Sequence, residues 1–187
     1  VSWSSDGSLA FCGTGQRPGV TLDESAFSMS SDDGDNWQQL SLMDTILNLC
    51  DIAPAPNSDS LFVATYSLYG PEGIWRSAST RPGIGEYWSR QLTMSTTSNR
   101  VILRLSPGYA SDYTIYAAEV GGNLMAVSHN RGNSWKQRRA PGAVIDLVVE
   151  DENTLYTALS GGYIRKSTNS AFTWEEPVRS GLSEINM

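Results

Sequence analysis

Two groups of carboxylates in this 187-residue sequence could do chemistry. Asp32, Asp33 and Asp35 put three acidic side chains close together, and oxygen ligands of this kind attract Ca²⁺. Asp51 and Asp146 lie in or beside short apolar runs, and a glycoside hydrolase needs two carboxylates that flank the scissile bond. A metal site and a catalytic pair are therefore the two chemical hypotheses to weigh against the architecture.

The acidic cluster lies in an eight-residue segment that the chain repeats. Residues 30–37 read Ser-Ser-Asp-Asp-Gly-Asp-Asn-Trp, residues 128–135 read Ser-His-Asn-Arg-Gly-Asn-Ser-Trp, and residues 167–174 read Ser-Thr-Asn-Ser-Ala-Phe-Thr-Trp. Residues 77–88 form a longer, degenerate copy. Ser, Asp and Asn side chains bond to nearby main-chain amides, Gly permits a left-handed turn, and Trp packs beneath. The pattern predicts a hairpin turn that each repeat needs for its own folding.

Variation among the copies favours this structural role over metal binding. The copies keep Ser and Trp, whereas Asp becomes Asn130 and Asn169, and Gly becomes Ala171. The spacing also lacks the alternating ligands and the closing Glu of an EF-hand loop. We therefore predict no metal and no cofactor. The residues assigned to the structural role are Ser30, Asp32, Gly34, Trp37, Ser128, Asn130, Gly132, Trp135, Ser167, Asn169 and Trp174.

The elements that position these loops are predicted to be β-strands. Short β-branched and aromatic runs separated by Gly, Pro, Asn, Asp and Ser fill the chain, without a long helical period. The final Trp residues of the four loop copies are 51, 47 and 39 positions apart. A four-stranded propeller blade has roughly 40 to 50 residues. The sequence thus predicts an all-β chain, a β-propeller made of about four four-stranded antiparallel blades.

The predicted blades cover residues 1–42, 43–95, 96–139 and 140–179, and residues 180–187 begin a further or closing strand. Two arrangements remain open. The two ends of the chain could pair and close a four-bladed ring, or the chain could be a segment of a larger propeller. We favour the segment because both ends are abrupt and would leave strand edges uncovered.

The repeated loop resembles a known motif. Ser30, Asp32, Gly34 and Trp37 fit the pattern S-x-D-x-G-x-T/S-W of the Asp-box, or BNR repeat. This repeat occurs in sialidases, sortilin-type receptors, some glucanases, photosystem assembly factors and bacterial surface proteins. In that family the motif lies on the hairpin between the third and fourth strands, at the outer rim. The resemblance implies that the loops are structural and that function lies elsewhere; Ala171 departs from the pattern.

Polar residues recur in the predicted innermost strands, which border the central channel of a propeller. We take them as the candidate ligand-binding set. The alternative is that they pair with one another or with solvent and bind no ligand. The four residues are Asn48, Arg104, Asp146 and Asn186.

The sequence assigns no catalytic residue, although Asp51 and Asp146 are weak candidates. A sialidase needs three arginines, a Tyr with a Glu, and an acidic proton donor, and the Arg-Ile-Pro signature of that family is missing; Arg17-Pro18 lacks its middle residue. His129 is the single histidine and occupies a variable loop position that we expect to be exposed. A histidine-rich zinc site is thereby excluded.

Charge and composition limit the classes of partner that the chain is expected to bind. The net charge of −7 argues against nucleic acid, which proteins bind with clustered Lys and Arg. The basic run at residues 136–139 is most simply a solvated strand end, with a docking patch for an anionic partner as the alternative. No apolar run is long enough to span a membrane. Cys12 and Cys50 lie in strand-like runs and are expected as buried thiols, with a disulfide between them as the alternative.

These observations favour a non-catalytic scaffold or recognition module that binds a protein or a glycan. The resemblance implies an extracellular or cell-surface location, including surface-layer types, although no signal peptide is visible and the chain begins at Val1. The alternatives are a fragment of an Asp-box glycoside hydrolase, sialidase-like or glucanase-like, and an assembly-factor propeller. The acidic charge argues against the last. The aromatics expected in surface loops, where they could contact a ligand, are Tyr66, Tyr69, Tyr87 and Tyr109.

Overall fold

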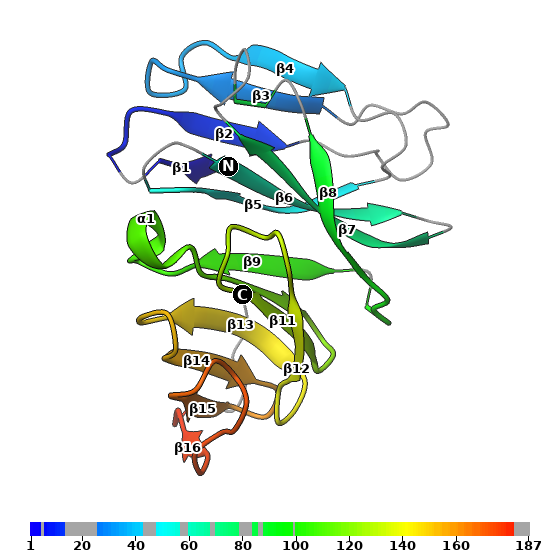
Figure 1. The fold of residues 1–187 in the computed structure, drawn as a ribbon, viewed down its shortest axis with the longest axis vertical. Helices are drawn as coiled ribbons and strands as arrows, with labels where there is room; N and C mark the ends of the chain where they lie inside the picture. Colours follow the sequence, from blue (N-terminus) through cyan, green and yellow to red (C-terminus); the bar gives the residue numbers. More distant parts are fainter. Residues whose placement is uncertain are drawn as a thin grey trace. The chain divides into compact units, whose positions relative to one another are not determined.

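The computed structural model describes residues 1–4, 6–13, 26–42, 48–56, 60–67, 70–78, 84–85, 88–98 and 100–181. Within these residues sixteen strands form four antiparallel sheets of four strands each (Figure 1). Every sheet is a meander in which neighbouring strands are also consecutive in the chain. The prediction of an all-β chain made of four-stranded units is confirmed. In the described part of the chain no helix is long and apolar enough to cross a membrane.

The chain divides into two compact units, Val1–Ser95 and Thr96–Met187. The first unit contains two sheets. One consists of β1 (Ser2–Trp3), β2 (Ala10–Gly13), β3 (Ala26–Ser30) and β4 (Gln38–Leu42), and the other of β5 (Asn48–Pro54), β6 (Ser60–Ser67), β7 (Gly70–Ala78) and β8 (Ser89–Met94). Phe11 of β2 packs with Leu61 and Val63 of β6, and all three are buried. Apolar side chains from both sheets therefore form the core of this unit.

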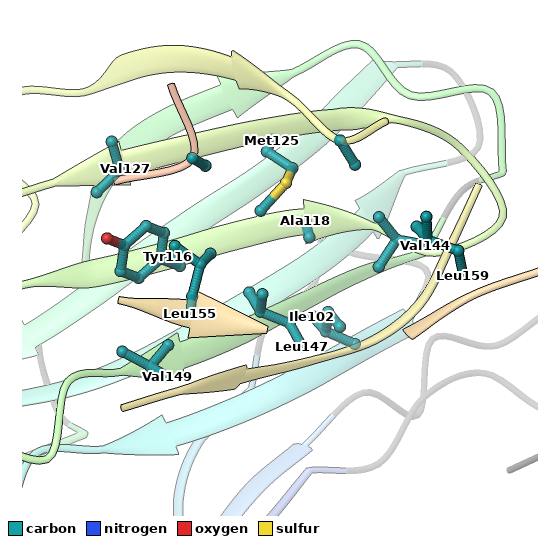
Figure 2. Close-up of a cluster of buried hydrophobic side chains, with 12 residues drawn as sticks. Ile102, Tyr116, Ala118, Met125, Val127, Val144, Leu147, Val149, Leu155 and Leu159 are labelled. Carbon is teal, nitrogen blue, oxygen red and sulfur yellow. The ribbon is translucent and has the colours of Figure 1, made fainter. Parts of the chain in front are cut away.

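The second unit also contains two sheets. One consists of β9 (Val101–Leu105), β10 (Ile115–Glu119), β11 (Leu124–Ser128) and β12 (Lys136–Arg139), and the other of β13 (Val144–Val149), β14 (Leu155–Leu159), β15 (Tyr163–Ser167) and β16 (Val178–Arg179). A cluster of buried side chains joins the two sheets (Figure 2). Tyr116 of β10 lies opposite Val127 of β11 in this cluster. Leu147 and Leu155 of the other sheet pack against them.

The last strand is shorter than predicted. The sequence indicates a strand over residues 174–178, whereas β16 contains Val178 and Arg179 only. The N–H of Glu175 still donates to the carbonyl of Lys166 at 2.8 Å. Pro177 then has no N–H to continue the ladder. Residues 167–174 form the fourth copy of the loop in chain order, hereafter the fourth loop. The ladder that follows this loop is interrupted between Glu175 and Val178.

One helical turn, α1 (Tyr109–Asp112), was not predicted. It buries Tyr109 completely, with the ring of Tyr113 edge-on at 6.1 Å, so the expectation that Tyr109 is a surface aromatic is wrong. Tyr66 is half-buried on β6, while Tyr69 and Tyr87 lie outside the described residues.

The two cysteines are half-buried thiols in the first unit. Cys12 lies on β2 and Cys50 on β5, and the structure forms no disulfide between these two described residues. The structure therefore agrees with the expectation of two free thiols and not with a disulfide between them.

Candidate functional site

A buried serine begins each copy of the repeated loop, at or near the end of the third strand of each sheet. Its hydroxyl oxygen accepts the N–H of the residue at the Gly position. These hydrogen bonds are 3.0 Å from Gly34 to Ser30, 2.7 Å from Gly85 to Ser77, 2.9 Å from Gly132 to Ser128, and 3.1 Å from Ala171 to Ser167. All four copies, including the degenerate one, thus share this hydrogen bond.

The Asp or Asn two residues after the serine has the same contacts in three copies. Its Oδ1 accepts the serine hydroxyl and the main-chain N–H four residues further on; for Asp32 these distances are 2.7 Å from Ser30 and 2.9 Å from Asn36. Asn130 and Asn169 repeat this geometry. The structural role predicted for these positions therefore has a direct physical basis.

The second oxygen or nitrogen of this side chain explains why Asp and Asn exchange. Asp32 Oδ2 accepts from Asn36 Nδ2 at 2.7 Å, whereas Asn130 Nδ2 donates to Ser134 Oγ at 2.8 Å. The two partners change together, so a donor always meets an acceptor. The side-chain and main-chain N–H groups of Asn36 hold the pKa of Asp32 below its usual value. Among the described residues no group of His, Cys, Asp or Glu is arranged to hold a metal ion.

We expect Asn130→Ala to lower the free energy of unfolding by about 1 to 2 kcal/mol, because Ser128 and the N–H of Ser134 lose their acceptor. Asn130→Asp keeps Oδ1 and can accept the Ser134 hydroxyl, so we expect a loss of less than about 0.5 kcal/mol. Urea unfolding followed by tryptophan fluorescence measures both. Equal losses would show that the shared Oδ1 contacts do not stabilise the loop.

The fourth copy departs from the others at its tryptophan. The indole N–H donates to the carbonyl of the glycine three residues earlier in the other copies, at 2.9 Å for Trp37, 2.7 Å for Trp88 and 2.9 Å for Trp135. Trp174 instead donates to the carbonyl of Arg139 on β12, at 3.0 Å. The loop containing Ala171 is therefore fastened to the neighbouring sheet. The Trp37 indole contacts its own loop through this bond to Gly34, although 40% of the residue is exposed.

Two of the candidate channel residues meet in the second unit. Arg104 Nη2 lies 2.8 Å from Asp146 Oδ1, and Arg104 Nε donates to the carbonyl of Leu147 at 3.1 Å. The pair joins β9 to β13, the first strands of the two sheets. This arrangement fits the alternative of paired residues that bind no ligand. The structure describes the backbone of Asn48 on β5 but not its side chain, and Asn186 lies outside the described residues.

Asp51 and Asp146, the weak catalytic candidates, occupy the same position in two sheets. The strand register shifts between Leu49 and Asp51 in β5 and between Val144 and Asp146 in β13. Each carboxylate accepts the N–H of the next residue, at 2.9 Å from Ile52 and 2.8 Å from Leu147. A β-bulge interrupts the ladder, and a neighbouring carboxylate can satisfy an N–H that the ladder no longer uses.

His129 is exposed, as predicted, and its Nδ1 lies 3.0 Å from Thr114 Oγ1. Partial desolvation of the ring and the nearby charge of Lys136 lower the pKa of the imidazole. Asp112 directs its two oxygens to Ser106 Oγ at 2.6 Å and to the N–H of Thr114 at 2.7 Å. These hydrogen bonds of Asp112 and His129 stabilise the turn around α1.

A pocket in the second unit was not predicted from the sequence. It has a volume of about 290 Å³ and is lined by Gln137, Arg138 and Arg139 of β12 and by Ala171 and Phe172 of the fourth loop. The basic run at residues 136–139 was one signal for it. Phe172 was another, because the corresponding residues are Asp35 and Asn133 in the other regular copies. The contact between β12 and a loop of another sheet could not be read from the sequence.

Comparison with known proteins identifies the fold. The sequence matches no protein-family model and no curated protein. Its structure is similar to the GH74 enzyme of Niastella koreensis, with a TM-score of 0.66 and 17% identity over 92% of this chain. It is also similar to YCF48 bound to a D1 peptide, with a TM-score of 0.53 and 18% identity over 81% of this chain. Both are β-propeller proteins, so the four sheets are propeller blades.

A third similar structure is a functionally unknown protein from Desulfotomaculum acetoxidans, with a TM-score of 0.66 and 12% identity over 97% of this chain. The chain spans 23% of the GH74 enzyme, 46% of YCF48 and 56% of the third protein. At these identities the similarity shows the propeller fold and leaves function to be argued from the residues.

Proposed function

We propose that this chain is a non-catalytic, protein-binding module built from Asp-box propeller blades. The observation that carries the proposal is that the described polar residues considered for catalysis or ligand binding bond to other groups of the fold. Asp146 pairs with Arg104 and accepts the N–H of Leu147, and Asp51 accepts the N–H of Ile52. These carboxylates stabilise strands, and the repeated loops use their own Asp and Asn oxygens in the same way.

Peptide binding by a similar fold supports this proposal, because YCF48 has been solved with a D1 peptide. We place the protein outside the cell or on its surface, as its acidic composition with two lysines suits that environment. Protease accessibility on intact cells that express the natural gene tests the location. Protection until the cells are lysed would contradict it.

Selection from a phage-displayed library of random peptides tests the function. We expect the chain to enrich related sequences that bind it as synthetic peptides in calorimetry. A glycan array and a panel of fluorogenic glycosides should then give no signal. Glycan binding without peptide binding would replace the proposal with a carbohydrate-recognition module.

The second candidate is part of a glycoside hydrolase, which the similarity to the GH74 enzyme favours. Hydrolysis of any polysaccharide in a reducing-sugar assay, lost in Asp51→Asn or Asp146→Asn, would support this candidate. Folding of each variant must first be checked by circular dichroism, because both carboxylates hold main-chain groups.

A further inference from the structure

We propose that the pocket between β12 and the fourth loop binds a short acidic peptide segment of a partner protein. Arg138 and Arg139 hold its carboxylates, and Phe172 contacts an adjacent apolar side chain. This inference rests on the proposed function, for which it names a site and a ligand chemistry.

The pocket lies where the sequence of the fourth loop differs from that of the other loop copies. Ala171 and Phe172 stand where the third copy has Gly132 and Asn133. Phe172 is 72% exposed. The residues at the same position of the other regular copies are polar, so the turn itself does not require an aromatic ring there. Trp174 fastens the same loop to the carbonyl of Arg139. Two substitutions and one changed hydrogen bond in this loop thus accompany an exposed ring beside a basic strand.

The guanidinium of Arg138 is oriented toward this ring before any ligand binds. Its Nε donates to the carbonyl of Ser170 and its Nη1 to the carbonyl of Gln137, both at 3.0 Å. The guanidinium carbon lies 5.5 Å from the centre of the Phe172 ring. Both hydrogen-bond partners are neutral, and a guanidinium has five N–H donors. Arg138 therefore retains donors and a full positive charge, in a fixed position that suits a carboxylate.

Arg139 also lines the pocket and provides a second positive charge beside it. Its Nη1 donates to Asn123 Oδ1 at 3.0 Å, which is again a neutral partner. Across the described residues neither Arg138 nor Arg139 forms an ion pair with a carboxylate. In a chain with a net charge of −7, the run at residues 136–139 contains three cations. This local excess of positive charge would attract an acidic partner despite the overall charge.

The strand itself favours a peptide over an acidic sugar. β12 is one of the two edge strands of its sheet, so part of its main-chain N–H and C=O groups faces away from β11. The carbonyl of Arg139 already accepts the Trp174 indole, so a peptide would bond to the other main-chain groups of this edge. An extended peptide can bond to such an edge while its side chains enter a pocket. The exposed Phe172 adds an apolar contact that suits a peptide with aliphatic or aromatic residues.

Fluorescence anisotropy of two labelled peptides tests this site on the full chain. The first is Gly-Asp-Glu-Leu-Phe-Glu-Asp-Gly and the second is its uncharged counterpart, Gly-Asn-Gln-Leu-Phe-Gln-Asn-Gly. We expect the acidic peptide to bind at least about tenfold more tightly. The indole N–H resonance of Trp174, assigned with Trp174→Phe, should shift during the titration because it contacts the carbonyl of Arg139.

Arg138→Gln/Arg139→Gln should abolish the preference for the acidic peptide. Arg165→Gln/Arg179→Gln is the matched control, because it removes the same charge from β15 and β16, outside the pocket lining. Phe172→Asn restores the polar residue of the other copies and should weaken both peptides about fivefold or more. Equal binding of the two peptides, or equal loss in the two double variants, would overturn the proposed site.

Hyaluronan oligosaccharides provide the third ligand in the same assay. Binding of the sugar that is lost in the pocket variants, without binding of the acidic peptide, would overturn the peptide as occupant. Peptides selected from the phage library separate the two proposals. If they bind the pocket variants as well as they bind the wild type, the proposed function stands and this site is wrong. If no peptide binds the wild type, both are wrong.

Discussion

Replacement of Tyr116 by alanine is expected to lower the free energy of unfolding by about 3 to 5 kcal/mol. Tyr116 is fully buried on β10, in the cluster that joins the two sheets of the second unit (Figure 2). Its hydroxyl donates to the carbonyl of Glu152, in the turn between β13 and β14, at 2.8 Å. The substitution therefore removes both a large apolar contact and a hydrogen bond between the sheets.

Tyr116→Phe separates these two contributions. It keeps the ring and leaves the carbonyl of Glu152 without this donor, so we expect a loss of about 1 kcal/mol. Thermal unfolding and urea titration of the full chain measure both variants. Similar losses for phenylalanine and alanine would mean that the hydroxyl, and not the ring, joins the sheets. A loss below about 1 kcal/mol for alanine would contradict the packing described here.

The same residue predicts an alkaline transition. Burial raises the pKa of Tyr116 to about 12, above the ordinary value of 10.0. A tyrosine with a raised pKa in the folded protein contributes stability that is complete below pH 10 and declines as the pH rises toward 12. The unfolding free energy of the wild type should fall over this range relative to that of Tyr116→Phe. Parallel curves for the two proteins would show that the hydroxyl ionises normally.

The strands and the repeated loops could be predicted because their signals are local. Ser128, Asn130 and Gly132 bond to one another within five residues, so the sequence of the turn contains its own geometry. Val144–Val149 has the bounds that its apolar run indicates. The alternation of apolar and polar residues and the preferences of turn residues each involve only a few neighbouring positions, so both are visible in the sequence alone.

The contacts between sheets could not be predicted in this way. The sequence suggested that Arg104 and Asp146 share a channel, but their ion pair depends on how β9 and β13 pack. Trp174 looks like the other loop tryptophans and yet bonds to a strand of the preceding sheet. Tyr109 was misplaced because a helix of four residues is too short to show a periodicity. For Arg104 and Trp174 the determining partner lies in a distant part of the chain.

Glu119 is another residue whose role depends on distant partners, and Glu119→Ala is expected to cost about 2 to 4 kcal/mol. The side chain is buried at the end of β10. Its Oε1 accepts the N–H of Thr97 at 2.6 Å, the hydroxyl of Thr97 at 2.8 Å and the N–H of Ser98 at 3.2 Å, and Oε2 accepts the N–H of Leu124 at 3.4 Å. Removal of the carboxylate leaves these donors without their acceptor.

Matched variants identify the source of that cost. Glu119→Gln keeps one acceptor oxygen but loses the charge, so we expect about half the loss seen with alanine. Glu150→Ala is the control, because Glu150 is exposed and its ion pair with Lys166 spans 3.9 Å at the surface. In urea unfolding at neutral pH, the loss of unfolding free energy should be largest for Glu119→Ala, smaller for Glu119→Gln and smallest for Glu150→Ala. A loss for Glu150→Ala as large as that for Glu119→Ala would contradict the buried network.

Acid unfolding gives an independent test of Glu119. Burial opposes its ionised form, but the hydrogen bonds from Thr97, Leu124 and Ser98 outweigh burial and hold the pKa of the carboxyl below its ordinary value of 4.5. Stability from a carboxyl with a lowered pKa is complete above the ordinary value and is lost as the pH falls through the value in the folded protein. Asp32 and Asp151 also have lowered pKa values, so the difference between wild type and Glu119→Gln isolates this residue. That difference should shrink below pH 4.5, and a constant difference would show that the ionised carboxylate does not fasten Thr97 and Ser98 to β10.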